Sequence, residues 1–421
     1  MKVKNYFENM PLSSSVYIKS LKNKKSSSIY SPFEILVALI WIKDIILSYV
    51  KGAMLKIPII NNIAEFLIPV LISLFVILSI PEFLKKIKLS DFIFYLTVIL
   101  ICIVNFFIFP ENQNVLLKIV PGFLLFIVPM YFIGTTIDLN RIYKLLYWLS
   151  VFTIFARLLY SVTLEKSMSE VESLYTGDMM ASYQLLPHVC AVILSLFNKP
   201  NFINIISSAI GVIFIFSLGS RGPLVCFAVF VIFYLLFFKK YKKPMLVYTS
   251  IITAGGVLFL FFDRLLILLY NISLKLGLSI RIFAKFFEGD FFVSSSRNRI
   301  IEVLFEKISE KPVLGYGIAG DRTLVGGYSH NLAVELWVSF GIIIGTILLG
   351  VLFFICIKAL IKSRKNNVDN MAILLLICCG LINLFLSGSY LSAPYLFLLI
   401  GLCISVIRKS KNKTDAFLKG D

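Results

Sequence analysis

The chain has 421 residues, of which 59% are hydrophobic and only 15% are charged, and its formal net charge is +18. A soluble domain could not bury that much apolar surface, so the composition excludes a soluble globular protein and indicates an integral membrane protein. A large positive charge can indicate nucleic-acid binding. Here, however, the Lys and Arg residues gather just beyond the ends of apolar segments, as the positive-inside bias requires, and no nucleic-acid partner is expected.

The apolar residues form separate blocks of roughly 17 to 25 residues, which is the length that a helix needs to cross a bilayer. Strand-like alternation is absent, which argues against a membrane β-barrel. Helices then remain as the way to satisfy the hydrogen bonds of the backbone in lipid. We therefore predict an all-α polytopic membrane protein, with a single membrane domain over residues 1–421 and about twelve spans. The predicted spans are residues 33–50, 65–80, 91–110, 115–134, 144–164, 181–197, 202–219, 222–238, 244–262, 331–357, 371–387 and 390–407.

The charges between these spans predict their orientation. With the N-terminus inside, cations are abundant in the inside segments, and the short outside loops hold only Lys51, Lys56, Lys166 and Arg221. This asymmetry predicts that both termini are cytoplasmic, as an N-terminal segment of residues 1–32 and a tail of residues 408–421. The same topology places the long loop of residues 263–330, between the ninth and tenth spans, outside the membrane.

The long loop has two parts with different patterns. Residues 263–287 mix Leu, Ile and Phe with spaced cations, which predicts an amphipathic helix along the membrane surface. Residues 297–310 have apolar side chains at helical spacing. The KPVLGYG string then ends this second helix, because Pro312 breaks it and Gly315 and Gly317 permit a tight turn.

His330 is the first candidate for chemistry, and it is one of two histidines in the chain. It lies where the chain re-enters the membrane, after the flexible Gly326-Gly327 pair. Histidine is the side chain best suited to proton transfer near neutral pH. The alternative is a polar interfacial residue at a helix start, where Ser329 or Asn331 would serve as the cap.

Arg221 is the sole cation in the tight outside turn between the predicted seventh and eighth spans, where it follows Ser220 and precedes Gly222 and Pro223. A guanidinium keeps its charge in a low-dielectric site, and its fork matches phosphate oxygens. The position favours an anionic head group as ligand. The alternative is an ordinary interface residue whose charged end reaches water.

Arg297 and Arg299 lie at the start of the second loop helix. They are two residues apart, so on a regular helix they point in different directions. At most one of them is then expected to face the same point as His330, and either could be a solvated charge at the helix start. Spacing does not choose between them.

Two further ionisable groups lie at membrane depth, where such residues usually face a cavity or a partner. Arg157, in the outer half of the predicted fifth span, is a candidate for a second anion contact. His188 follows Pro187 in the sixth span and could equally bond a carbonyl that the proline frees. Lys43 and Asp44 in the first span are expected to form a local structural pair.

Several kinds of chemistry have no sequence support. P-loop, HExxH and GxSxG strings are missing, which argues against nucleotide hydrolysis, zinc proteolysis and serine hydrolysis. The seven cysteines all fall within apolar segments, where they behave as small hydrophobes, and they predict neither a disulfide framework nor a metal site. The first outside loop lacks the acidic pair of many metal-dependent membrane glycosyltransferases. We expect no metal and no other cofactor.

The order of motifs resembles that of the O-antigen polymerase and O-antigen ligase superfamily of bacterial polysaccharide assembly. The matching features are SLGSRGPL and, in the long loop, an arginine, an amphipathic helix, KPVLGYG and SHN, followed by ELWVSFGIIIG. The twelve-span layout is similar over the whole chain, whereas the specific matches lie in residues 217–223 and 294–345. Family members often have a tryptophan shortly after the loop arginine. This chain reads IIEV there, which leaves the choice between Arg297 and Arg299 open.

The resemblance implies inverting, metal-independent glycosyl transfer at the outer face of the bacterial cytoplasmic membrane. The donor would be an undecaprenyl-pyrophosphate-linked glycan and the acceptor another glycan. By position, His330 would be the general base, and Arg221 with one of Arg297 or Arg299 would bind the pyrophosphate.

The leading hypothesis is an O-antigen or capsule polysaccharide polymerase, whose acceptor is another lipid-linked repeat unit. The first alternative is a ligase that transfers the glycan to a lipid A core. A lipid-linked oligosaccharide flippase or other transporter is a further alternative, and it would not need a base in the long loop. Membrane lipid and, as an optional partner, a chain-length regulator complete the expected partners.

Overall fold

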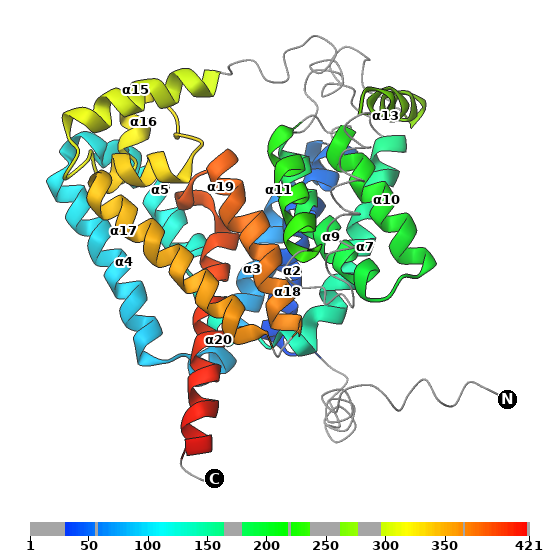
Figure 1. Cartoon of the computed structure of the whole chain (residues 1–421), viewed down its shortest axis with the longest axis horizontal. Helices are drawn as coiled ribbons and strands as arrows, with labels where there is room; N and C mark the ends of the chain where they lie inside the picture. Colours follow the sequence, from blue (N-terminus) through cyan, green and yellow to red (C-terminus); the bar gives the residue numbers. More distant parts are fainter. Residues whose placement is uncertain are drawn as a thin grey trace, which may run out of the picture.

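The computed structural model describes residues 30–54, 58–163, 179–217, 220–235, 262–276, 296–364 and 367–418. In these ranges the chain forms helices and no strand, so the predicted all-α class is confirmed (Figure 1). The elements are α2 (Pro32–Met54), α3 (Pro58–Lys86), α4 (Leu89–Ile108), η2 (Pro110–Asn112), α5 (Gln113–Gly122), η3 (Phe123–Ile127), α6 (Met130–Thr136), α7 (Leu139–Thr163), α9 (Met179–Asn198), α10 (Phe202–Ser217), α11 (Arg221–Phe233), α13 (Phe262–Leu276), α15 (Ser296–Glu310), α16 (Gly320–Val325), α17 (Leu332–Ser363), α18 (Asn367–Leu376), η6 (Ile377–Ile382), α19 (Asn383–Leu386), η7 (Tyr390–Ser392) and α20 (Pro394–Leu418).

Six helical stretches in the described ranges are long and apolar enough to cross a membrane. They are Leu89–Ile108, Pro110–Thr136, Leu139–Leu159, Ala181–Asn198, Leu332–Ser363 and Val368–Leu386. The shorter apolar helices α10 and α11 coincide with the predicted seventh and eighth spans. A polytopic membrane fold is therefore confirmed. The total of about twelve spans stays a prediction, because nearly all of the predicted span 244–262 falls outside the described residues.

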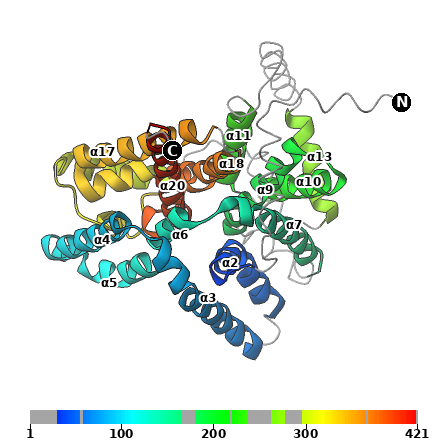
Figure 2. The same cartoon turned by 90° about the horizontal axis from the view of Figure 1, so that it is seen from below.

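The spans differ in how much of their surface is exposed. Only 17% of the apolar window of α4 and 22% of that of α17 is buried, against 61% for α9 and for the stretch from α18 to α19. Large apolar side chains such as Phe107 and Ile343 point outward from α4 and α17. Figure 2 shows α4 and α17 on the same side of the protein and α20 nearer its middle. These two helices therefore offer the surface that lipid would cover.

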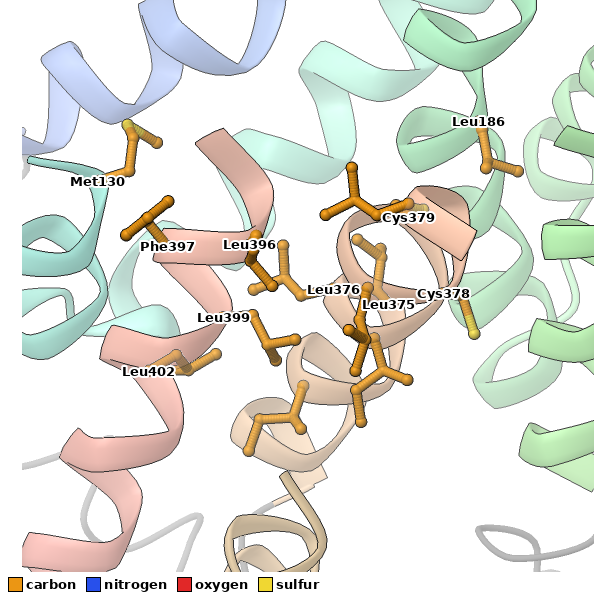
Figure 3. Close-up of a cluster of buried hydrophobic side chains, with 14 of the residues drawn as sticks. Met130, Leu186, Leu375, Leu376, Cys378, Cys379, Leu396, Phe397, Leu399 and Leu402 are labelled. Atoms are coloured by element: carbon orange, nitrogen blue, oxygen red, sulfur yellow. The ribbon is translucent and has the colours of Figure 1, made fainter. Parts of the chain in front are cut away.

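The centre of the bundle is built on close contacts between backbones. A Cβ atom on Gly134 of α6 would lie 2.4 Å from the Leu398 carbonyl oxygen, and one on Gly401 of α20 would lie 2.0 Å from that of Tyr131. Small residues permit this approach between helices in membranes. Around the crossing, side chains of α6, α18, η6 and α20 interlock in an apolar core (Figure 3). The seven cysteines are all buried, as expected for small hydrophobes.

The C-terminal half of α20 is held by an ion pair. Arg408 Nη1 lies 2.7 Å from Asp91 Oδ1 of α4, and the hydroxyl of Tyr131 donates to the same carboxylate at 2.9 Å. Helix α20 continues to Leu418, through most of the predicted tail 408–421, where lysines, which favour helix, recur and no proline interrupts the chain. The apolar pattern marks where a span ends, not where the helix ends.

The KPVLGYG loop fills a break in α17. Gly341 has φ 77° and ψ 167°, which interrupts the helix. The loop bonds to both sides of the break, since Tyr316 N donates to the Val338 carbonyl and Ile342 N donates to the Pro312 carbonyl, each at 2.7 Å. Two sequence motifs that are far apart in the chain, KPVLGYG and ELWVSFG, thus form one structural unit.

Two asparagines attach this loop to the C-terminal end of α4 and to η2, which follows it. Asn112 Nδ2 donates to the Tyr316 carbonyl at 2.6 Å, and its Oδ1 accepts from the Thr323 hydroxyl at 2.7 Å. Asn105 Oδ1 accepts from Ile318 N at 2.8 Å. Both asparagines are buried, so the loop is fixed by bonds that water does not weaken. The KPVLGYG loop, which precedes the His330 turn, is therefore held firmly against the helices.

Candidate functional site

His330 sits in the short turn between α16 and α17. Its backbone has φ 57°, one of two positive values among the described residues other than glycine. Such a conformation is costly for a residue with a Cβ and persists only where neighbours impose it. Here they do, because Asn331 caps α17 by accepting from Ala333 N and Val334 N. Of the two residues considered as the cap of this helix, Ser329 and Asn331, it is Asn331 that caps it.

The imidazole of His330 is packed but keeps a nitrogen without a partner. The Tyr328 ring lies against it, with ring centroids 4.0 Å apart. Nδ1 is buried and has no hydrogen-bond partner among the described residues. Burial, together with the positive charge of Arg297, lowers the pKa of His330 below its usual value of 6.5. The ring is therefore neutral near pH 7 and able to accept a proton.

Arg297 and Arg299 have different environments, as their spacing predicted. Arg297 is half-buried, and its Nη1 donates to the Leu386 carbonyl of α19 at 3.1 Å. Arg299, on the same helix α15, is exposed. Arg297 is close enough to His330 to lower the pKa of the imidazole. Only this arginine is brought to the candidate base.

We expect the pH dependence of the reaction to follow from this arrangement. A histidine with a lowered pKa keeps its basic form as the pH falls, and it loses that form only when the pH passes below the lowered pKa. The acid limb of the rate should therefore lie below pH 6.5. Arg297→Gln removes the neighbouring cation, so the pKa of His330 and the acid limb should both move up.

The ¹⁵N imidazole signals of the labelled protein, followed against pH, would measure this shift directly. The chain has two histidines, so His330→Gln assigns the spectrum. Arg299→Gln is the matched control, because it removes an exposed arginine of the same helix and should leave the pKa of His330 unchanged. An unchanged pKa in Arg297→Gln would contradict the assignment.

A cluster of buried charges lies behind the His330 turn, and the sequence analysis missed it. Arg322 Nη1 lies 2.9 Å from Asp321 Oδ1 and 3.3 Å from Glu335 Oε1, while its Nη2 donates to the Ser389 hydroxyl at 2.6 Å. Ser389 also donates to Glu335, and Tyr390 N donates to Glu335 Oε2 at 3.0 Å. The sequence signal for this cluster was Glu335, a lone glutamate one turn inside a long apolar helix, where a charged residue usually has a partner.

This cluster contains two carboxylates and one guanidinium. Asp321 and Glu335 are 0% and 1% exposed, so both carboxylates are removed from water. Burial raises the pKa of Asp321, while Arg322 and the backbone N–H groups of Ser329 and Arg322 oppose that rise. Removing the arginine would leave two acids in one buried site, which is strongly unfavourable.

The short helix α19 links the His330 turn to the other half of the bundle. The Phe385 carbonyl of α19 accepts from Asn331 Nδ2 at 3.2 Å, and Leu386 accepts from Arg297. Helix α19 also packs against α11, whose first residue is Arg221 (Figure 1). Helices α11, α15 and α17 thus each contact α19.

Arg221 is half-buried at the start of α11, after Ser220, which is 5% exposed. The next residue, Gly222, is in contact with the Tyr183 hydroxyl of α9, since a Cβ there would lie 1.9 Å from that oxygen. The Tyr183 hydroxyl is buried and has no hydrogen-bond partner in the described part of the chain. Spacing alone did not point to Tyr183.

The remaining two candidates, His188 and Arg157, lie on α9 and α7, and no described hydrogen bond joins them to the His330 turn. His188 Nδ1 lies 3.2 Å from the Ser150 hydroxyl, which also accepts from Trp41 Nε1 at 3.0 Å. His188 is thus a buried member of a polar contact between α2, α7 and α9, and this partner is a hydroxyl, not the carbonyl that was considered. Arg157 is 4% exposed in α7. Its role in anion binding stays a prediction.

The described residues contain no group of three or more His, Cys, Asp or Glu side chains placed to hold a metal ion. What the turn does offer is a neutral imidazole, a nearby guanidinium and a rigid support. These groups can take a proton from a hydroxyl and hold an anion, which are the two requirements of a transfer reaction with an anionic leaving group.

Comparison with known families identifies the part of the chain that carries these groups. Residues 206–350 match the family model described as O-antigen ligase. The matched stretch contains Arg221, Arg297 and His330, whereas Arg157 and Ser389 lie outside it. No curated protein and no solved structure matches the chain. Over residues 206–350, this membrane protein is therefore similar to the O-antigen ligase family, which supports the resemblance to the O-antigen polymerase and ligase superfamily.

Proposed function

We propose that the protein is a polysaccharide polymerase that joins undecaprenyl-pyrophosphate-linked repeat units of an O-antigen or capsule at the outer face of the cytoplasmic membrane. The observation that carries the proposal is the neutral His330, with a buried, unpartnered Nδ1, held beside Arg297 within the family-matched stretch. Family members are membrane glycosyltransferase-like enzymes, which supports transfer over transport.

In the proposed step, a hydroxyl of the acceptor sugar attacks the anomeric carbon of the donor from the face opposite the pyrophosphate. The new C–O bond forms as the bond from carbon to pyrophosphate oxygen breaks, so the configuration inverts. His330 takes the hydroxyl proton, and undecaprenyl pyrophosphate leaves as the anion. Arg221 and Arg297, with Arg157 as a further candidate, hold the pyrophosphate charge, and no metal ion is required.

The second candidate is ligation of the finished glycan to a lipid A core, which the description of the matching family favours. Polymerase and ligase share the chemistry and differ in the acceptor. An assay in liposomes with purified lipid-linked repeat units separates them. A ladder of longer glycans from repeat units alone supports the polymerase, and transfer only after lipid A core is added supports the ligase. Translocation without any new glycosidic bond would indicate a flippase.

Arg221 should contribute to donor binding more than to the chemistry of His330. Charge-assisted hydrogen bonds contribute about 1.5–3 kcal/mol, so we expect Arg221→Gln to weaken the binding of the lipid-linked donor by about 10- to 100-fold. Binding of labelled donor to the purified variant measures this effect. Lys307→Gln is the control, because Lys307 pairs with Glu310 on the exposed side of α15, away from the turn. Equal affinity in Arg221→Gln and wild type would remove Arg221 from the site.

A further inference from the structure

The residues just before His330 do little to fix the conformation of its turn. It begins at Gly326, which has φ 72°, and a Cβ atom on Gly326 or on Gly327 would meet nothing within 4 Å. A glycine pair in open space is conformationally free, and ordering it costs entropy. The defined position of His330 must therefore come from contacts outside the turn.

We propose that Arg322 is a positioning residue for His330: with Asp321, Glu335 and Ser389 it forms a buried hub that holds the Tyr328–Asn331 turn in one conformation. This inference rests on the proposed function and deepens it. The hub joins α16, the first turns of α17 and the corner between α19 and η7, which are separate in sequence. A guanidinium suits this place because its planar fork bonds several acceptors at once.

Two chains of contacts lead from the hub to the turn. In the first, Asp321 pairs with Arg322 through Oδ1 and accepts from Ser329 N through Oδ2 at 2.9 Å. The Ser329 hydroxyl then donates to the Asn331 carbonyl at 3.0 Å. The residues on both sides of His330 are thus fixed by buried hydrogen bonds, and the left-handed backbone of His330 follows.

The second chain runs through an aromatic ring. The guanidinium carbon of Arg322 lies 5.9 Å from the centroid of the Tyr328 ring, within the range of a cation–π contact. Tyr328 in turn packs on the imidazole of His330. The first chain sets the backbone, and the second sets the plane of the ring. Nδ1 of His330 is a buried polar atom of this turn without a hydrogen-bond partner among the described residues.

The test compares Arg322→Met with Arg408→Met in the full-length protein. Each variant removes an arginine that pairs with a nearly unexposed carboxylate, but Arg408 and Asp91 lie at the opposite end of the protein. We expect both variants to lose thermal stability, and Arg322→Met to lose more because it leaves two buried carboxylates together. Only Arg322→Met should shift or split the ¹⁵N imidazole signals of His330, and only it should lower kcat, by about 10- to 100-fold with little change in donor KM.

Two further variants keep the test decisive if Arg322→Met does not fold. Tyr328→Leu leaves the ionic hub intact and should still shift the His330 signals. Arg322→Lys keeps the positive charge but loses the planar guanidinium, so its kcat should lie between those of Arg322→Met and wild type. Unchanged His330 signals in folded Arg322→Met and Tyr328→Leu would overturn the proposal. So would a loss of kcat in Arg408→Met equal to that in Arg322→Met.

The imidazole signals are measured without turnover, so the two proposals can fail separately. If His330→Gln keeps full transferase activity while Arg322→Met still shifts the His330 signals, the hub is confirmed and His330 is not the base. If His330→Gln is inactive and the signals do not move in Arg322→Met, the proposed function survives and the positioning role is wrong.

Discussion

Replacing His330 with glutamine should lower kcat of glycosyl transfer by about 10²–10⁴-fold, the contribution of a well-placed general base. Glutamine keeps a similar size and hydrogen-bonding capacity but does not accept a proton near pH 7. Donor binding should change little, because the proposed anion contacts are arginines. Formation of glycan from purified lipid-linked repeat units in liposomes measures the effect.

The control for this variant is Ser309→Ala. Ser309 is exposed on α15 and donates only to the Phe305 carbonyl of its own helix, so its loss should leave kcat and KM at wild-type values. Undiminished chain growth in a folded His330→Gln protein would sink the assignment of the base. Loss of donor binding together with kcat would instead indicate that His330 contacts the lipid-linked donor.

Gly341→Ala should release the KPVLGYG loop from α17 and inactivate the protein. The backbone at Gly341, with φ 77° and ψ 167°, lies in a region that only glycine occupies readily. A Cβ there would also lie 2.1 Å from the Val313 carbonyl oxygen. The backbone strain alone is worth about 1–3 kcal/mol, and avoiding the contact would require breaking the bonds that Pro312 and Tyr316 make to the two sides of the break.

Thermal unfolding and limited proteolysis near Lys311 would report this change. Gly350→Ala is the matched control, since Gly350 lies in the same helix and a Cβ there meets nothing within 4 Å. We expect it to keep the wild-type melting temperature and digestion pattern. If Gly341→Ala melts and digests like Gly350→Ala, the loop is not held by the break in α17.

Some of the site could be predicted from the sequence because local rules govern it. The helix of residues 297–310 was expected from apolar spacing, and α15 covers Ser296–Glu310. The turn glycines Gly315 and Gly317 both have positive φ, as their role in a tight turn required. The two arginines had to diverge on a helix, and they do. Periodicity, helix breakers and rare residues carry such information within a few residues of each other.

Other parts could not be predicted because they depend on contacts across long stretches of chain. Glu335 meets Ser389 over 54 positions, and Asn112 meets Tyr316 over 204. The position of Glu335 at the start of an apolar helix does not predict its hydrogen-bond partners. Asn112, near the end of a predicted span, is indistinguishable in sequence from an ordinary interface residue. The residues that rigidify the site were missed for this reason.

The sequence by itself determined a helical membrane protein with a charged loop, a rare histidine and the arginines suited to an anion, because hydrophobic length and residue chemistry are local properties. The tertiary structure decided which arginine stands beside His330, which carboxylates surround Arg322, and why α17 breaks at Gly341. Those outcomes follow from helix packing, which brings together side chains that no local pattern relates. They hold His330, the proposed base, beside Arg297.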